Sequence, residues 1–389
     1  MNIAHPAAAL LVILLCLAVA HCIAVTSPFF SRRLKEEEGG RFGGVDGLRG
    51  FLAVGVLFTH VINTWHFYTE GAWSGHGDNG LGSTGETGVA LFFMITGFLF
   101  WRRVLRSPEN GALDTVALYR SRIRRIVPMY VASVLIVLVV VAVMSGFSLN
   151  SSPGEVLREL RSWFSFGFMN TGEINGVADA RYINPVYWTL AFEWGFYLAL
   201  PFLALFARGP WSIALFALVV LFGLRVPVTL NFLCGALAAL AVERGLLVGR
   251  RLESAYLTPV AIAALLGGLH FSYGPAHTLL LFVFFLLVVG GNTLFGLLAT
   301  TSARLLGMVS YSYYLLHSIV LFVIMRQVEL RISMANLGAL EYWLFAGLAA
   351  AVAVLLSALT YRHIEYPFFA KHAITGEGSA SWPRLVPAS

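Results

Sequence analysis

Long apolar runs follow one another along almost the whole chain and are separated by short polar segments. A transmembrane helix needs about 20 residues, and the three runs between 211 and 270 are shorter than that. The pattern predicts an all-α integral membrane protein, a polytopic bundle of about eleven transmembrane helices. The approximate ranges are 7–26, 45–66, 88–105, 127–147, 185–206, 211–225, 228–243, 256–270, 277–296, 305–325 and 340–361.

The composition supports a membrane environment. Of the 389 residues, 58% are hydrophobic and only 12% are charged, whereas soluble domains carry about 25% charged residues. This number of charges is too small to cover a water-facing surface. The chain must therefore use lipid as its solvent. Cys16, Cys22 and Cys234 lie in apolar stretches without metal-ligand spacing, and we expect neither a disulfide framework nor a metal site.

The basic residues predict the orientation in the membrane. With an outside N-terminus, nineteen of the 26 Lys and Arg residues fall in cytosolic segments and six fall in outer segments. Short cytosolic loops are enriched in Lys and Arg, so we expect the C-terminus in the cytosol. The formal net charge of +6 therefore reflects topology, and no nucleic-acid partner is expected.

The first apolar run resembles a signal peptide in length, but no Lys or Arg precedes it and Arg32, Arg33 and Lys35 follow it. This arrangement favours a retained anchor. We expect three parts: residues 1–43 as N-terminal anchor and linker, 44–370 as the main membrane domain, and 371–389 as a short cytosolic tail.

The remaining basic residue, Arg49, begins the second apolar run, and His60 follows eleven positions later. Eleven helical residues rise about 16 Å and return to nearly the same face. Asp46 is close enough to orient or neutralise Arg49. Alone, Arg49 is explained by contact with headgroups and His60 by packing in the interior. As an aligned pair they favour a cavity that both side chains share, either a pore or an active site.

Two further groups are candidates for chemistry. Glu193 lies inside the fifth apolar run with Tyr197 one turn on, and such a carboxylate calls for a functional role and a nearby partner. Arg122 and Arg125 belong to a dense basic cluster. They are explained equally well as a topology signal or as a site for the phosphates of a nucleotide-bearing donor.

Three positions favour structural roles. Gly97 permits close approach of a neighbouring helix. Tyr313 and His317, four residues apart, are typical of a structural hydrogen-bonded pair. Glu365 lies three residues from Arg362, which favours an ion pair at the cytosolic edge.

Together these segments resemble the membrane-bound acyltransferase-3 family, which contains bacterial O-acetyltransferases of lipopolysaccharide and other surface glycans. Thr96 and Thr189 stand where serine is common in that family, and Ser318 where an aromatic residue is frequent. The matching segments, in the family's order, are Asp46-Gly-Leu-Arg49 with His60; Phe92-Phe93 with Gly97; Arg122 to Arg125 leading to Pro128; Trp188-Thr189-Leu190 with Glu193 and Tyr197; Ser310-Tyr311 with Tyr314 and His317; and Ile364-Glu365-Tyr366-Pro367.

The resemblance implies a ten-helix core, to which the first helix here is an N-terminal addition. It also implies that Arg49 and His60 are the catalytic pair and that Arg122 and Arg125 help to bind acyl-CoA. The donor would be acetyl-CoA in the commonest case, with no permanently bound cofactor. The acceptor would be a glycan or lipid-linked sugar, in the bacterial inner membrane. We do not expect the extracytoplasmic domain that is frequent in the family, so the membrane domain or a separate periplasmic partner would complete the transfer.

The residues suggest how such a reaction would run. As a hypothesis, His60 is the general base for the acceptor hydroxyl, and Arg49 positions the donor or stabilises developing negative charge. Glu193 would orient His60 or bind the acceptor. The alternatives are a transporter that uses the Arg49–His60 line as its substrate path and a membrane sensor or scaffold with structural charges.

Overall fold

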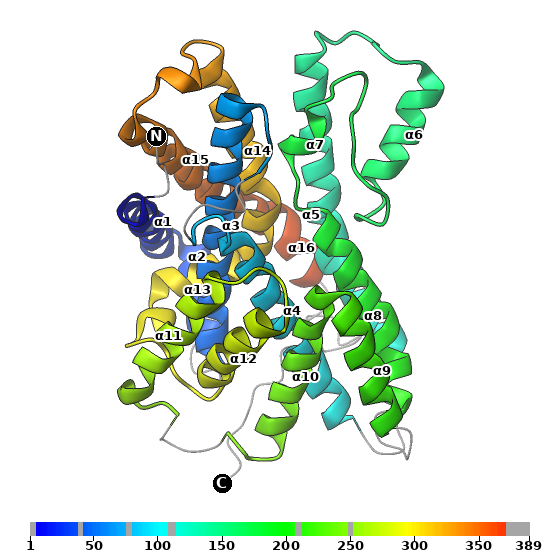
Figure 1. Cartoon of the computed structure of the whole chain (residues 1–389), viewed down its shortest axis with the longest axis vertical. Coiled ribbons are helices and arrows are strands. Elements are labelled where there is room, and N and C mark those ends of the chain that lie inside the picture. Colours follow the sequence, from blue (N-terminus) through cyan, green and yellow to red (C-terminus); the bar gives the residue numbers. More distant parts are fainter. Residues whose placement is uncertain are drawn as a thin grey trace.

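The computed structural model describes residues 5–37, 42–74, 80–107, 114–206, 212–247 and 252–370. The predicted tail, 371–389, lies outside the described residues. In the part that is described every regular element is a helix, which confirms the all-α class (Figure 1). The α-helices are α1 (Pro6–Thr26), α2 (Pro28–Glu36), α3 (Gly43–Glu70), α4 (Thr84–Arg106), α5 (Thr115–Met144), α6 (Pro153–Trp163), α7 (Ala180–Ile183), α8 (Trp188–Phe206), α9 (Ser212–Arg225), α10 (Leu230–Glu243), α11 (Thr258–Leu269), α12 (Pro275–Val289), α13 (Thr301–Met308), α14 (Ser310–Glu329), α15 (Ala339–Thr360) and α16 (Tyr366–Ala370).

Short turns complete this set. They are the 3₁₀ turns η1 (Pro227–Thr229), η2 (Ala255–Leu257), η3 (Leu297–Ala299) and η4 (Met334–Asn336), and the π-helical turn η5 (Tyr361–Glu365). Because η5 runs directly from α15 into α16, residues 339 to 370 form one continuous helical segment.

Each of the eleven apolar runs forms a helix, but the structure does not confirm eleven spans. Six helices in the described residues are long and apolar enough to cross a membrane, or seven if α13 and α14, bent by 77°, form one span. The helices α9 to α12, with their 3₁₀ turns, are apolar but hold only 10–17 residues each, at or below the lower limit of about 17 residues for a single crossing. The chain is nevertheless a multi-pass membrane protein.

Small residues let the central helices approach closely. A Cβ atom on Gly97 of α4 would lie 2.2 Å from the carbonyl oxygen of Phe232 on α10, and one on Gly235 would lie 2.1 Å from that of Met94. These distances confirm Gly97 as a close-packing position. In the same way, a Cβ on Gly307 of α13 would lie 1.8 Å from the carbonyl oxygen of Asp46, so α13 fixes the beginning of α3.

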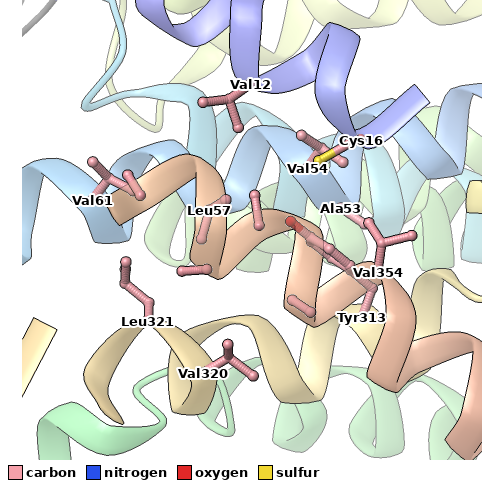
Figure 2. Close-up of a cluster of buried hydrophobic side chains, with 14 of the residues drawn as sticks. Val12, Cys16, Ala53, Val54, Leu57, Val61, Tyr313, Val320, Leu321 and Val354 are labelled. Atoms are coloured by element: carbon pink, nitrogen blue, oxygen red, sulfur yellow. The ribbon is translucent and has the colours of Figure 1, made fainter. Parts of the chain in front are cut away.

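Helix α1 packs along α15 and α13 (Figure 1). The small buried residues of α1 recur about every fourth position, which keeps them on one helical face. This face packs against a row of alanines on α15. Figure 2 shows Val12 and Cys16 beside Val54 of α3, Val354 of α15 and Tyr313 of α14. The two rows are Ala9, Cys16, Ala20 and Ala24 on α1, and Ala346, Ala349, Ala350 and Ala353 on α15.

Candidate active site

A cavity of about 110 Å³ lies among α3, α4, α5, α8 and α14. Four of the five side chains proposed from the sequence line it: Arg49 from α3, Arg122 and Arg125 from α5, and Glu193 from α8. The structure therefore brings together residues that are up to 144 positions apart in the sequence. Its other polar lining residues are Thr96, Thr189, Tyr197, Ser310, Tyr311 and Tyr314.

Glu193 and Arg122 are linked through Tyr197. The Tyr197 hydroxyl donates a hydrogen bond to Oε1 of Glu193. The Arg122 guanidinium lies 4.9 Å from the ring centroid of Phe100 and 5.9 Å from that of Tyr197. A planar guanidinium stacked on rings is held in a defined orientation, so one end of the cavity presents a fixed cation beside a fixed carboxylate.

Arg49 and Arg125 supply two further cations. Among the described residues neither guanidinium has a hydrogen bond or an ion pair, although Asp46, Glu193 and Glu365 all lie within electrostatic range of Arg49. Asp46 is thus a neighbour of Arg49 rather than a direct partner. Three arginines face one lining carboxylate, so the cavity favours an anionic or electron-rich group.

The expected ion pair between Arg362 and Glu365 is wrong. Glu365 is 0% exposed, and its Oε1 accepts a hydrogen bond from the Ser312 hydroxyl. Arg362 faces outward, with its guanidinium 5.5 Å from the ring centroid of Phe29. The π-helical turn η5 is wider than an α-helical turn, and it directs Glu365 to the interior while Arg362 stays outside.

Glu365 is a candidate that the sequence did not assign to the site. Its Oε2 is buried without a hydrogen-bond partner, and Arg125 and Arg49 are its cationic neighbours. A buried carboxylate needs compensating positive charge, so Glu365 belongs to the charge network behind the cavity. An Ile-Glu-Tyr-Pro sequence reveals no π-helical turn, so the ordinary helical spacing gave the wrong partner.

His60 lies on the same helix as Arg49 but does not line this cavity. Between them, on the same face of α3, Ala53 and Val56 are 1% and 2% exposed. No hydrogen bond joins His60 to Glu193 in the described part of the chain. The structure therefore does not place Arg49 and His60 in one continuous cavity, contrary to the expectation from their alignment.

His60 instead meets His317 and Trp73. The ring centroids of His60 and His317 are 5.3 Å apart, and those of His60 and Trp73 are 6.3 Å apart. Trp73 in turn stacks on Tyr182, at 4.7 Å. The Nδ1 atom of His60 is buried without a hydrogen-bond partner, so this nitrogen is available to a substrate that reaches it.

The Tyr313–His317 pair has a different form from the expected one. Nδ1 of His317 lies 3.0 Å from the carbonyl oxygen of Tyr313, and the two rings stack at 5.6 Å. Since a carbonyl only accepts, Nδ1 carries the proton, and Nε2 accepts from the Ser318 hydroxyl at 3.1 Å. The two residues are hydrogen-bonded to each other, but the acceptor is the main-chain carbonyl of Tyr313 and not its hydroxyl.

Tyr314 separates the cavity from the histidines. It lines the cavity, its hydroxyl lies 2.9 Å from that of Thr189, and its ring centroid lies 6.0 Å from that of His317. The side chains thus follow one another from cavity to Tyr314 to His317 to His60. Among the described residues no group of three metal-ligating side chains is placed to hold a metal ion.

Comparison with known proteins gives the family. A family model described as an acyltransferase domain, that of the acyltransferase-3 family, matches residues 42–362. No curated protein and no solved structure matches the chain. The matched range contains all five candidate residues and more than four-fifths of the sequence. The chain therefore belongs to the acyltransferase-3 family and is a membrane acyltransferase.

Proposed function

We propose that this protein transfers an acetyl group from cytosolic acetyl-CoA to a hydroxyl of a cell-surface or lipid-linked glycan, in the bacterial inner membrane. The proposal keeps the N-terminus outside and the C-terminus in the cytosol. The observation that carries it is the cavity where Arg49, Arg122 and Arg125 meet beside Glu193, with His60 further along the same helix α3.

We call the cavity lined by Arg49, Arg122, Arg125 and Glu193 the donor cavity. Its size and charge suit the reactive end of a thioester. Pockets for drug-sized ligands measure about 300–1,000 Å³, so a cavity of about 110 Å³ holds only a small part of acyl-CoA. Arginine donors bind the electron-rich oxygen of a thioester carbonyl and so position the donor before the acyl group moves towards His60. Arg49 and Arg125 suit this role because neither is engaged by an ion pair among the described residues.

The acceptor would approach His60. As general base, His60 takes the proton from the acceptor hydroxyl, the hydroxyl oxygen forms the ester bond, and the thioester C–S bond breaks. The proton then passes to the leaving thiolate, so CoA departs as a thiol. The imidazole is neutral again after each cycle.

Arg49 and His60 are too far apart to act on the same bound acyl group unless that group moves. Eleven residues of helix place His60 about 16 Å from Arg49 along α3, with Ala53 and Val56 between them. The acyl group of CoA sits at the end of a long flexible arm. We infer that the arm passes along α3 when Tyr314 leaves Thr189 and moves away from the cavity.

A vesicle assay tests the proposal. Inverted vesicles that contain the protein receive acetyl-CoA labelled in the acetyl group, and the label is sought in ester linkage to glycan. We expect ester label with the unaltered protein and loss with His60→Ala and Arg49→Ala. Unchanged acylation by both variants at normal protein levels would reject the catalytic assignment. Solute flux independent of acetyl-CoA would instead indicate a transporter.

A further inference from the structure

A second cavity, of about 410 Å³, lies between α2 and the segment formed by η5 and α16. Its cationic residues are Arg32, Arg33 and Arg362, and among the described residues Glu36 is the one carboxylate in its lining. Two aromatic residues, Phe29 and Tyr366, complete the lining. We call this site the α2 pocket.

Aromatic rings hold two of the three arginines of the α2 pocket, Arg33 and Arg362, in place. The rings of Phe29 and Tyr366 meet edge to face, with centroids 5.0 Å apart. The Arg33 guanidinium lies 5.2 Å from the Tyr366 centroid, and that of Arg362 lies 5.5 Å from the Phe29 centroid. Guanidinium groups stacked in this way are pre-organised for planar, two-pronged recognition of phosphate.

The charges of the α2 pocket are only partly balanced. Arg33 forms ion pairs with Glu36 at 2.6 Å and Glu37 at 3.0 Å. Arg32 and Arg362 are exposed and have no ion pair among the described residues. Two cations therefore remain for an anion from outside the chain.

Most of the α2 pocket lies outside the part of the chain that matches the acyltransferase model. That match runs from 42 to 362, so Arg362 is its last residue and the other five lining residues lie beyond its limits. The pocket is thus built by the N-terminal helices of this chain against its last helical segment, and the family match does not account for it.

The α2 pocket and the donor cavity have two charged or polar neighbours in common. Tyr361, at the start of η5, lies within electrostatic range of both Arg33 of the α2 pocket and Arg125 of the donor cavity. Glu37 at the end of α2 has Arg33, Asp46 and Arg125 among its charged neighbours. A ligand in the α2 pocket would therefore lie within electrostatic range of Arg125 of the donor cavity.

We propose that the α2 pocket binds the phosphate ester of an amphipathic ligand through Arg32 and Arg362. Two sources share this chemistry: the phosphates of the acyl-CoA donor, and the headgroup of an anionic phospholipid. The first source rests on the proposed function, because the donor cavity holds only the reactive end of acyl-CoA. The second does not depend on that function.

Two binding measurements on the full-length protein in nanodiscs separate the sources. The first measures the Kd of labelled CoA and of 3′-dephospho-CoA in neutral phosphatidylcholine discs. The second measures retention of phosphatidylglycerol by native mass spectrometry. The test variant is Arg32→Gln/Arg362→Gln, and the matched control is Lys35→Gln, an exposed cation on α2 outside the pocket.

We expect the double variant to lose about tenfold or more in one of the two measurements, while Lys35→Gln resembles the unaltered protein. A loss confined to CoA identifies the donor phosphates, and a loss confined to phosphatidylglycerol identifies the lipid. If the double variant matches Lys35→Gln in both, the proposal is overturned. The single variant Arg32→Gln, at an exposed position, carries the test if the double variant does not fold.

Neither measurement requires turnover. The proposal for the α2 pocket and the proposed function can therefore be rejected independently of each other. If the unaltered protein shows no acylation but the double variant binds less ligand, only the proposed reaction is rejected. If acylation is normal but the double variant binds its ligands as the unaltered protein does, only the proposal for the α2 pocket is rejected.

Discussion

The rings of His60 and His317 lie 5.3 Å apart in the interior of the bundle, and only His317 has both nitrogens engaged. Its Nδ1 donates to the Tyr313 carbonyl and its Nε2 accepts from Ser318, whereas Nδ1 of His60 has no partner. Two neighbouring histidines therefore differ in what they offer a substrate. His60 has a nitrogen available for proton transfer, and His317 is fixed as a packing partner.

This difference predicts unequal effects of substitution. His60→Ala should lower the acylation rate by about 10²–10⁴-fold, the usual contribution of a general base. His317→Phe retains a ring against His60 and should lower the rate by less than about tenfold. Initial rates of label transfer at matched protein levels test this. Equal losses in the two variants would contradict the assignment of His60 as the base.

Arg122 should be sensitive even to replacement by lysine. Its guanidinium lies over the rings of Phe100 and Tyr197, and an ammonium group can neither stack in the same way nor bind an anion with two prongs. We expect Arg122→Lys to raise the KM for acyl-CoA about tenfold with little change in kcat. Arg124→Lys is the control, because Arg124 belongs to the same basic cluster but does not line the cavity. Equal KM values would show that Arg122 does not contact the donor.

Glu365 should contribute to stability through its charge. The Ser312 hydroxyl can still donate to an amide oxygen in Glu365→Gln, but Arg49 and Arg125 lose a nearby negative charge. We expect the free energy of unfolding to fall by about 2 kcal/mol, since removal of one partner leaves buried charge uncompensated. Thermal unfolding in detergent measures this, with the exposed Glu173→Gln as control. An unchanged unfolding temperature would mean that Glu365 is uncharged in the folded protein.

The sequence predicted the helices well because lipid imposes a simple rule. Backbone groups in a bilayer must bond within their own segment, so each long apolar run had to become a helix. The same rule does not say whether a helix crosses the bilayer completely. The short runs between 211 and 270 were already visible in the sequence, whereas the 77° bend between α13 and α14 was not, because hydropathy does not encode the direction of a helix.

The sequence allowed four of the cavity-lining residues to be named, but it did not show how the cavity is separated from His60. Arg49 and Glu193 were marked by their cost at membrane depth. Arg122 and Arg125 were marked by their place in a basic cluster, and the structure gathers all four around one cavity. The alignment of Arg49 with His60 predicted a cavity shared by both side chains, which the structure does not show. It could not show that Tyr314, from a helix more than 250 residues later, fills the space between the cavity and the histidines.

Close packing at Gly97 gives the last prediction. A Cβ at this position would meet the Phe232 carbonyl oxygen at 2.2 Å, so Gly97→Ala must push α4 away from α10. We expect a loss of about 1–3 kcal/mol in the free energy of unfolding. Gly55→Ala, in α3, is the matched control because nothing lies within 4 Å of its added Cβ. That change should be neutral or stabilise by up to about 1 kcal/mol, since alanine favours a helix.

The same pair of variants connects packing to chemistry. Thr96, next to Gly97 on α4, lines the donor cavity, so a displaced α4 changes the shape of the cavity as well as the stability of the bundle. Gly97→Ala should therefore raise the KM for acyl-CoA even in protein that remains folded at the assay temperature, while Gly55→Ala leaves it unchanged. Parallel unfolding curves and kinetics of the two variants test both parts. Equal unfolding temperatures for the two alanine variants would show that α4 and α10 are not in close contact at Gly97.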